Sequence, residues 1–123
     1  MSVPVEESML ATELWVSFGS LVRSYAAAAS LNLGEPAEVA IDGNRIEAAA
    51  GAAVLSIQYD PGSRRGSWLL RAAGSGQESS GEFELLPDGR VSLDGSTIDL
   101  DHAAIDFAAA LMQAAARPAG SGL

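Results

Sequence analysis

Residues 39–48 read Val39-Ala40-Ile41-Asp42-Gly43-Asn44-Arg45-Ile46-Glu47-Ala48, and this stretch decides the fold class. Apolar side chains alternate with polar or small ones on both sides of a central Asp-Gly-Asn, which is a turn signal. A period of two places successive side chains on opposite faces of a strand. The stretch therefore predicts an antiparallel β-hairpin with one buried face.

Alternation of this kind continues to Leu100 between recurring turn residues. A second hairpin is predicted around the loop at residues 61–66, and further short strands around residues 83–85, 91–93 and 98–100. We expect five or six strands in an antiparallel meander. The side chains expected to face inward are Val39, Ile41, Leu55, Ile57, Trp68, Leu70, Phe83, Leu85, Val91, Leu93, Ile98 and Leu100.

Two stretches do not follow the alternation. Residues 48–53 are mostly alanine, and they are compatible with a bulged strand, a bend or a helical turn. Residues 74–81 are rich in Gly and Ser, which predicts a polar, flexible loop before the next strand.

A helix is predicted on each side of the strands. Residues 6–31 contain apolar side chains at helical spacing, and the Asn, Gly and Pro that follow predict the helix end. Asp101 is a good N-cap for a second helix that runs to about Arg117. We expect both helices on one face of the sheet, which gives a two-layer α+β fold. Residues 1–123 form a single domain in this prediction, with frayed ends at 1–5 and 118–123.

Charge and composition narrow the function classes. The chain has 123 residues and a net charge of −9, and it contains no cysteine. All seven basic residues are arginine, so a Walker phosphate loop, which needs lysine, is excluded. An acidic surface disfavours nucleic acid and anionic membrane as partners. We therefore predict no cofactor, no nucleic-acid partner, no membrane segment and a cytoplasmic location.

The long helix carries a second apolar stripe that includes Trp15, Phe18 and Val22. One interpretation is an exposed interface that forms a two-fold homodimer, because Trp is enriched at interfaces. The other is that a curved sheet lets one core absorb both stripes. We expect the homodimer to form through the long helix, with these three residues at its interface, or through a sheet edge.

One group of residues has the chemistry of a metal or acid–base site. His102 is the only histidine, and Asp99, Asp101 and Asp106 are close to it in the sequence. The competing interpretation is structural, because Asp101 suits a helix cap and carboxylates suit the first turn of a helix. We predict no catalytic residues, and these four remain weak candidates for a metal site.

In size, charge and order of elements, the chain resembles the small, acidic, dimeric chaperones of type III secretion systems. It departs from them because they have a helix within the strand series, whereas residues 67–100 show none, so membership is not inferred. The resemblance implies that helix residues and strand edges hold an extended partner segment. We expect a non-catalytic adapter or chaperone-like protein. The alternative is a small-ligand carrier or enzyme with a pocket between sheet and helices near His102.

Overall fold

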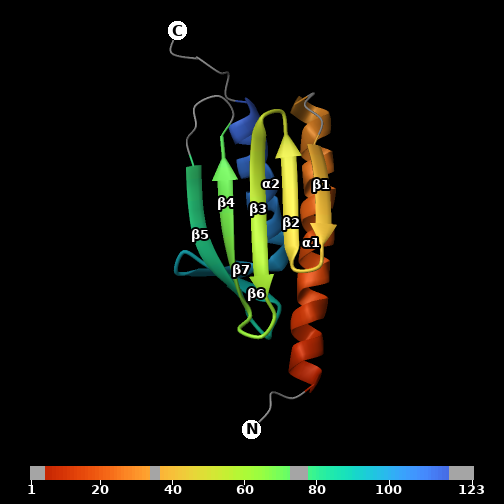
Figure 1. Cartoon of the computed structure of the whole chain (residues 1–123), viewed down its shortest axis with the longest axis vertical. Coiled ribbons are helices and arrows are strands. Elements are labelled where there is room, and N and C mark those ends of the chain that lie inside the picture. Colours follow the sequence, from red (N-terminus) through yellow and green to blue (C-terminus); the bar gives the residue numbers. More distant parts are fainter. Residues whose placement is uncertain (1–4, 34–36, 73–77, 117–123) are drawn as a thin grey trace.

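The computed structural model describes residues 5–33, 37–72 and 78–116 (Figure 1). In chain order these residues form a helix, a seven-stranded sheet and a second helix. The α+β prediction is confirmed. The elements in chain order are α1 (Val5–Leu33), β1 (Ala37–Asp42), β2 (Arg45–Ala50), β3 (Ala53–Asp60), β4 (Arg65–Arg71), β5 (Glu78–Leu85), β6 (Arg90–Leu93), β7 (Ser96–Asp99) and α2 (Leu100–Ala116).

The sheet is an antiparallel meander in which every strand pairs with its neighbour in sequence, in the order β1 to β7. It has seven strands rather than five or six, and the last two, β6 and β7, form a hairpin with four residues in each strand. Figure 1 views the sheet from its outer face, with α1 and α2 behind it. Both helices contact the sheet and each other, and no described element covers the outer face.

Within the alanine-rich stretch at residues 48–53, only Gly51 and Ala52 form a turn, which joins β2 to β3. Ala50 pairs with Ala53 across the two-residue turn Gly51-Ala52. Gly51 has a φ of +57°, in the left-handed region where glycine has no steric penalty. Gly51 thus allows the chain to turn between β2 and β3. The alanine residues around it do not indicate where these strands end.

The predicted loop at residues 74–81 is shorter than expected, because β5 begins at Glu78. Residues 73–77 lie outside the described residues. Glu78 pairs with Arg71 of β4, and their side chains form an ion pair at 2.7 Å. Cross-strand pairing therefore overrides the local preference of the Ser and Gly residues for a loop.

The helix boundaries agree with the predictions to within about two residues. The predicted stop at residues 34–36 and the predicted frayed ends lie outside the described residues, except Val5, which begins α1. Because α2 begins at Leu100, Asp101 lies in its first turn and is not the N-cap. The carboxylate still interacts favourably with the helix dipole there.

The stripe assigned to a homodimer interface is the core-facing side of α1, so the prediction that it is exposed is wrong. Trp15, Phe18 and Val22 are 3%, 0% and 1% exposed within a single chain. They pack with residues of the sheet and of α2, including Phe83 and Leu111. Both apolar stripes of α1 pack into one core, because α1 lies beside α2 and the sheet covers both helices.

Trp15 also fixes α1 to the first hairpin. Its indole Nε1 donates a 2.7 Å hydrogen bond to the carbonyl of Gly43 in the β1–β2 turn. Its ring stacks on Tyr59 of β3, with centroids 5.0 Å apart and an interplanar angle of 14°. Trp15 therefore connects α1 to the β1–β2 turn and to β3. Its indole N–H, a group that often bonds across interfaces, makes its hydrogen bond within the same chain.

Candidate functional site

His102 and its neighbouring carboxylates lie on the surface. The side chains of His102 and Asp106 are 65% and 53% exposed, and His102 Nε2 is 3.8 Å from Asp106 Oδ1. Asp99 and Asp101 are exposed as well. Within residues 5–33, 37–72 and 78–116, no three His, Asp or Glu side chains are grouped closely enough to hold a metal ion.

The alternative interpretation places a pocket near His102 between the sheet and the helices, where described side chains form a hydrophobic core. Phe83 and Leu111 belong to this core and are 3% and 0% exposed. The ring of Phe107 lies 6.4 Å from the ring of Phe83 and 5.8 Å from the ring of Trp68, in edge-to-face contacts. Aromatic side chains thus occupy this part of the core, and the imidazole of His102 lies on the surface.

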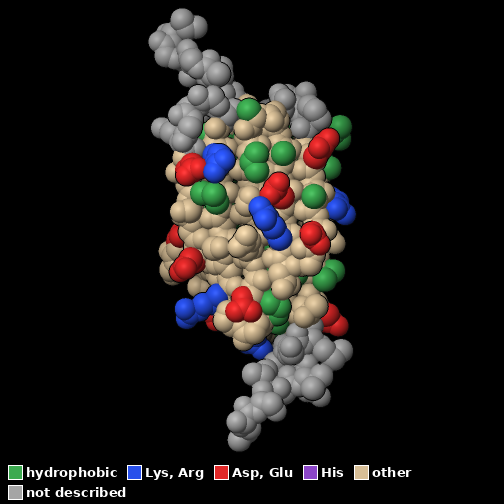
Figure 2. Space-filling model, viewed as in Figure 1, with side chains coloured by type: hydrophobic (Ala, Val, Ile, Leu, Met, Phe, Trp, Pro, Cys, Tyr) green, Lys and Arg blue, Asp and Glu red, His purple; other side chains and the backbone are tan. Residues whose placement is uncertain are grey.

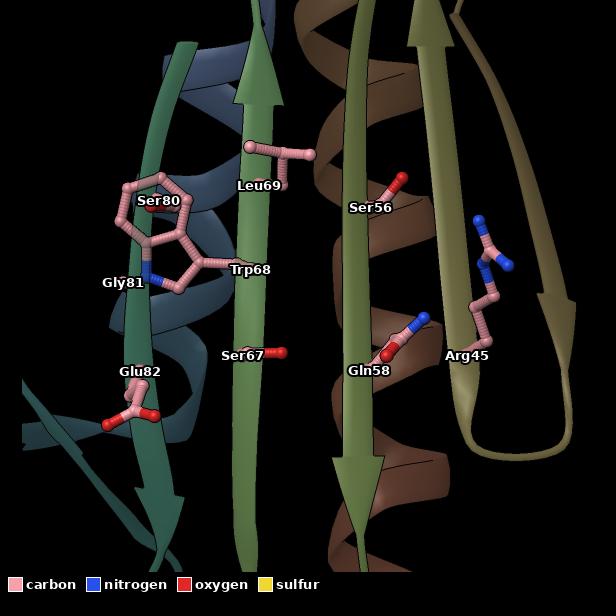
Figure 3. A pocket seen from close by; sticks show the side chains of 9 residues that line it. All are labelled: Arg45, Ser56, Gln58, Ser67, Trp68, Leu69, Ser80, Gly81 and Glu82. Carbon is pink, nitrogen blue, oxygen red and sulfur yellow. The ribbon is translucent and has the colours of Figure 1, made fainter.

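The surface that remains for binding is the outer face of the sheet, on the side opposite the helices. A hollow of about 500 Å³ lies over β2 to β5 (Figure 3). Both polar side chains and the apolar side chains of Trp68 and Leu69 line it, and Arg45 and Glu82 lie at opposite sides. The lining residues are Arg45, Ser56, Gln58, Ser67, Trp68, Leu69, Ser80, Gly81 and Glu82.

The upper part of the outer face is more apolar. Val54, Leu69 and Ala49 are half-buried there, and Ala49 pairs directly with Val54. Figure 2 shows apolar side chains in the upper part of this face, with charged side chains around them. An apolar centre within a polar rim is the usual arrangement of a protein interface. We call Ala49, Val54 and Leu69 the outer-face apolar cluster.

The charges around this cluster form local pairs. Arg45 contacts Glu47 at 2.9 Å on β2, and Arg71 contacts Glu78 at 2.7 Å between β4 and β5. These side chains are roughly half exposed, so each pair contributes little to the stability of the fold, about 0–1 kcal/mol. Their arginine and glutamate side chains can therefore exchange partners when another molecule approaches.

Two glycines in the strands bring aromatic rings close to the backbone on the inner side of the sheet. Gly81 lies opposite Trp68, and a Cβ at Gly81 would lie 2.8 Å from the indole nitrogen. Gly66 lies opposite Phe83, and a Cβ there would lie 2.2 Å from the ring. Neither pair was predicted from the sequence, although a glycine inside an alternating strand is a signal for such close approach.

Tyr59 contributes a buried hydroxyl to the core beneath the same strands. The residue is 4% exposed, and its hydroxyl has no hydrogen-bond partner among the described residues. Burial raises the pKa of Tyr59 above its ordinary value of 10.0. Arg64 acts to lower the pKa, whereas Asp60 and Glu84 raise it further. The neutral phenol is the form that the folded chain favours.

Replacing Tyr59 with Phe should leave the protein at least as stable at neutral pH, because it removes a buried polar group without a partner. The folded state holds the phenolic proton more tightly than the unfolded chain does. The wild type therefore keeps its stability below the ordinary pKa of 10.0 and loses it as the pH rises above that value. The Tyr59→Phe variant should lose less stability as the pH rises.

Urea unfolding of the wild type and Tyr59→Phe across a pH series tests this expectation. A variant that is less stable at neutral pH by more than about 1 kcal/mol would show that the hydroxyl has a stabilising partner. An identical loss of stability above pH 10 in both proteins would show that Tyr59 does not titrate as expected.

Comparison of the chain with protein-family models, with curated proteins and with solved structures gave a uniform result. Nothing matches. Among the described helices, none is both long enough and apolar enough to cross a membrane. The function must therefore be argued from the outer face of the sheet and its margins.

Proposed function

We propose that the chain is a non-catalytic protein-interaction domain, adapter-like or chaperone-like, that forms a homodimer through the outer face of its sheet. The observation that supports this proposal is that helices cover only one face of the sheet. Both helices pack on one face, while the other face keeps a hollow and a half-buried apolar cluster without cover from any described element. A cytoplasmic location remains part of the proposal.

A second copy of the chain suits this face because the face is mixed in charge. A two-fold contact places the same surface on both sides, so each copy must supply both signs. Arg45 and Arg71 lie on the same face as Glu47, Glu78 and Glu82, so opposite charges are available to both partners. A stable contact of this kind covers about 800 Å² per copy. That area is about one ninth of the total accessible surface of 7217 Å².

Light scattering coupled to size-exclusion chromatography tests the proposal. We expect the wild type to be a dimer and Leu69→Glu to be a folded monomer, because the new carboxylate would be buried at the centre of the contact. Val16→Glu is the matched control, since Val16 is 60% exposed on α1 and lies on the opposite side of the molecule from the hollow. It should remain a dimer.

A monomeric wild type would overturn the homodimer. A dimer that is lost in Val16→Glu but kept in Leu69→Glu would place the contact on the helices instead. Circular dichroism of each variant shows whether the fold is kept.

A further inference from the structure

The sheet has an open edge along half of β5. β5 pairs with β4 from Glu78 to Glu84, whereas β6 pairs only with Phe83, Glu84 and Leu85. In the described sheet, no strand lies beside residues 78–82 on the side away from β4. Figure 1 shows this half of β5 as the left margin of the sheet.

The backbone groups on this edge point outward. The N–H of Leu85 donates to the carbonyl of Arg64 at 2.9 Å, so the backbone of Leu85 faces the β4 side. In an antiparallel ladder, alternate residues direct both of their backbone groups to the same side. Ser80 and Glu82 fall on the other set, so their N–H and C=O groups face the open edge. Such an edge is a template for an added strand.

The other two edges of the sheet are less open. At β1, Arg23 of α1 donates a hydrogen bond from its guanidinium to the carbonyl of Val39 at 3.1 Å. At the opposite end, β7 has only four residues and contacts α2. A short or covered edge is the usual protection against pairing with another chain. β5 is therefore the edge best suited to accept a strand.

Charge indicates what kind of strand fits. Next to the open edge, a hollow of about 470 Å³ lies between β5 and the β6–β7 turn. Its lining carries three carboxylates, those of Glu82, Glu84 and Asp94, against the single guanidinium of Arg65. The surface beside the edge is therefore acidic, in keeping with the net charge of −9. A basic partner complements it.

A second copy of the chain fits this edge poorly. If two β5 strands paired antiparallel about Ser80, Glu78 of one copy would lie opposite Glu82 of the other. Like charges directly opposite each other destabilise a strand pair. The edge is therefore suited to a different chain and not to the homodimer contact.

We propose that residues 78–82 bind an extended segment of another protein as an added antiparallel strand, with Arg or Lys side chains of that segment facing Glu82 and Glu84. This inference rests on the proposed interaction function and names the class of partner. The backbone hydrogen bonds would supply affinity for any extended chain, and the carboxylates would select a basic one.

A synthetic peptide of alternating arginine and threonine is the probe, and a peptide of alternating glutamate and threonine is its control. Ser80→Pro removes an N–H that faces the open edge and leaves the bonds to β4 intact, so the fold should be kept. Ser80→Thr is the matched control because it keeps the N–H. Calorimetry with each peptide gives the dissociation constants.

We expect the arginine peptide to bind the wild type and Ser80→Thr, and to bind Ser80→Pro about tenfold more weakly or worse. The glutamate peptide should not bind. No binding of the arginine peptide to the wild type, or equal binding to Ser80→Pro, would overturn the proposal. If Ser80→Pro does not fold, Glu82→Lys supplies the test, because it should weaken the arginine peptide; unchanged affinity would overturn the proposal.

The two proposals fail separately. A wild type that is a dimer but binds no arginine peptide would remove the edge site and leave the proposed function in place. A monomer that binds the peptide at β5 would remove the homodimer and leave the edge site.

Discussion

Replacing Trp15 with Ala is expected to lower the free energy of unfolding by about 3–5 kcal/mol, as large-to-small changes of buried aromatic residues do. The change removes a ring that is 3% exposed, its stacking on Tyr59 and its hydrogen bond to Gly43. Domains of this size are stable by about 5–15 kcal/mol, so the loss is a large part of the total. Urea unfolding followed by tryptophan fluorescence of Trp68 and by circular dichroism measures it.

The neighbouring residue supplies the control. Val16→Ala, at a side chain that is 60% exposed, should change the free energy of unfolding by less than about 0.5 kcal/mol. If Trp15→Ala were instead a fully stable monomer while the wild type is a dimer, Trp15 would belong to an interface and its place in the core would be wrong.

Replacing Gly66 with Ala is expected to lower the free energy of unfolding by about 3 kcal/mol, the upper end of the usual range for an overpacked core. The new Cβ would lie 2.2 Å from Cζ of Phe83 and 2.6 Å from the backbone carbonyl oxygen of Gln58. Phe83 cannot move away easily, because it is 3% exposed and contacts Phe18, Tyr59 and Phe107. The thermal unfolding midpoint and the urea midpoint should both fall.

Gly62→Ala is the matched control in the adjoining turn. A Cβ there would meet only the Asp60 carboxylate oxygen, at 3.3 Å, so the free energy of unfolding should stay within about 0.5 kcal/mol of the wild type. Equal stability of Gly66→Ala and Gly62→Ala would show that the sheet opens at Phe83 more easily than the contacts imply.

The strands and the turns between them could be predicted because their signals are local. Alternation around residues 39–48, and turn residues at short intervals after it, fix strand, turn and strand without information from the rest of the chain. Antiparallel neighbours in sequence then become neighbours in the sheet. Even the alanine-rich turn contained its signal in Gly51, whose φ is +57°.

What packs against the apolar stripes of the long helix could not be predicted in the same way. Two apolar stripes on one helix look the same whether a second chain or a second helix covers them, and only the packing of α1 beside α2 decides. Trp15 suggested an interface because it combines a large apolar ring with a polar N–H. Its partner, the carbonyl of Gly43, is 28 residues away in the sequence, so no local pattern indicates the bond.

The candidate site was predictable only in outline. Alternation predicted which side chains face inward and left the other positions for the outer face, where the structure places Arg45, Gln58 and Glu82 around one hollow. It did not predict the open edge of β5, because that edge arises where the short β6 stops pairing at Phe83. Strand lengths and register depend on tertiary contacts, which alternation alone does not encode.

The most direct test of the interaction function is the mass of the protein in solution, measured by light scattering on the wild type and on Leu69→Glu at equal concentration. The outer-face contact predicts twice the chain mass of 12.6 kDa for the wild type and a single chain mass for a folded Leu69→Glu. A single chain mass for both proteins, or twice that mass for both, would contradict a homodimer formed through the outer face of the sheet.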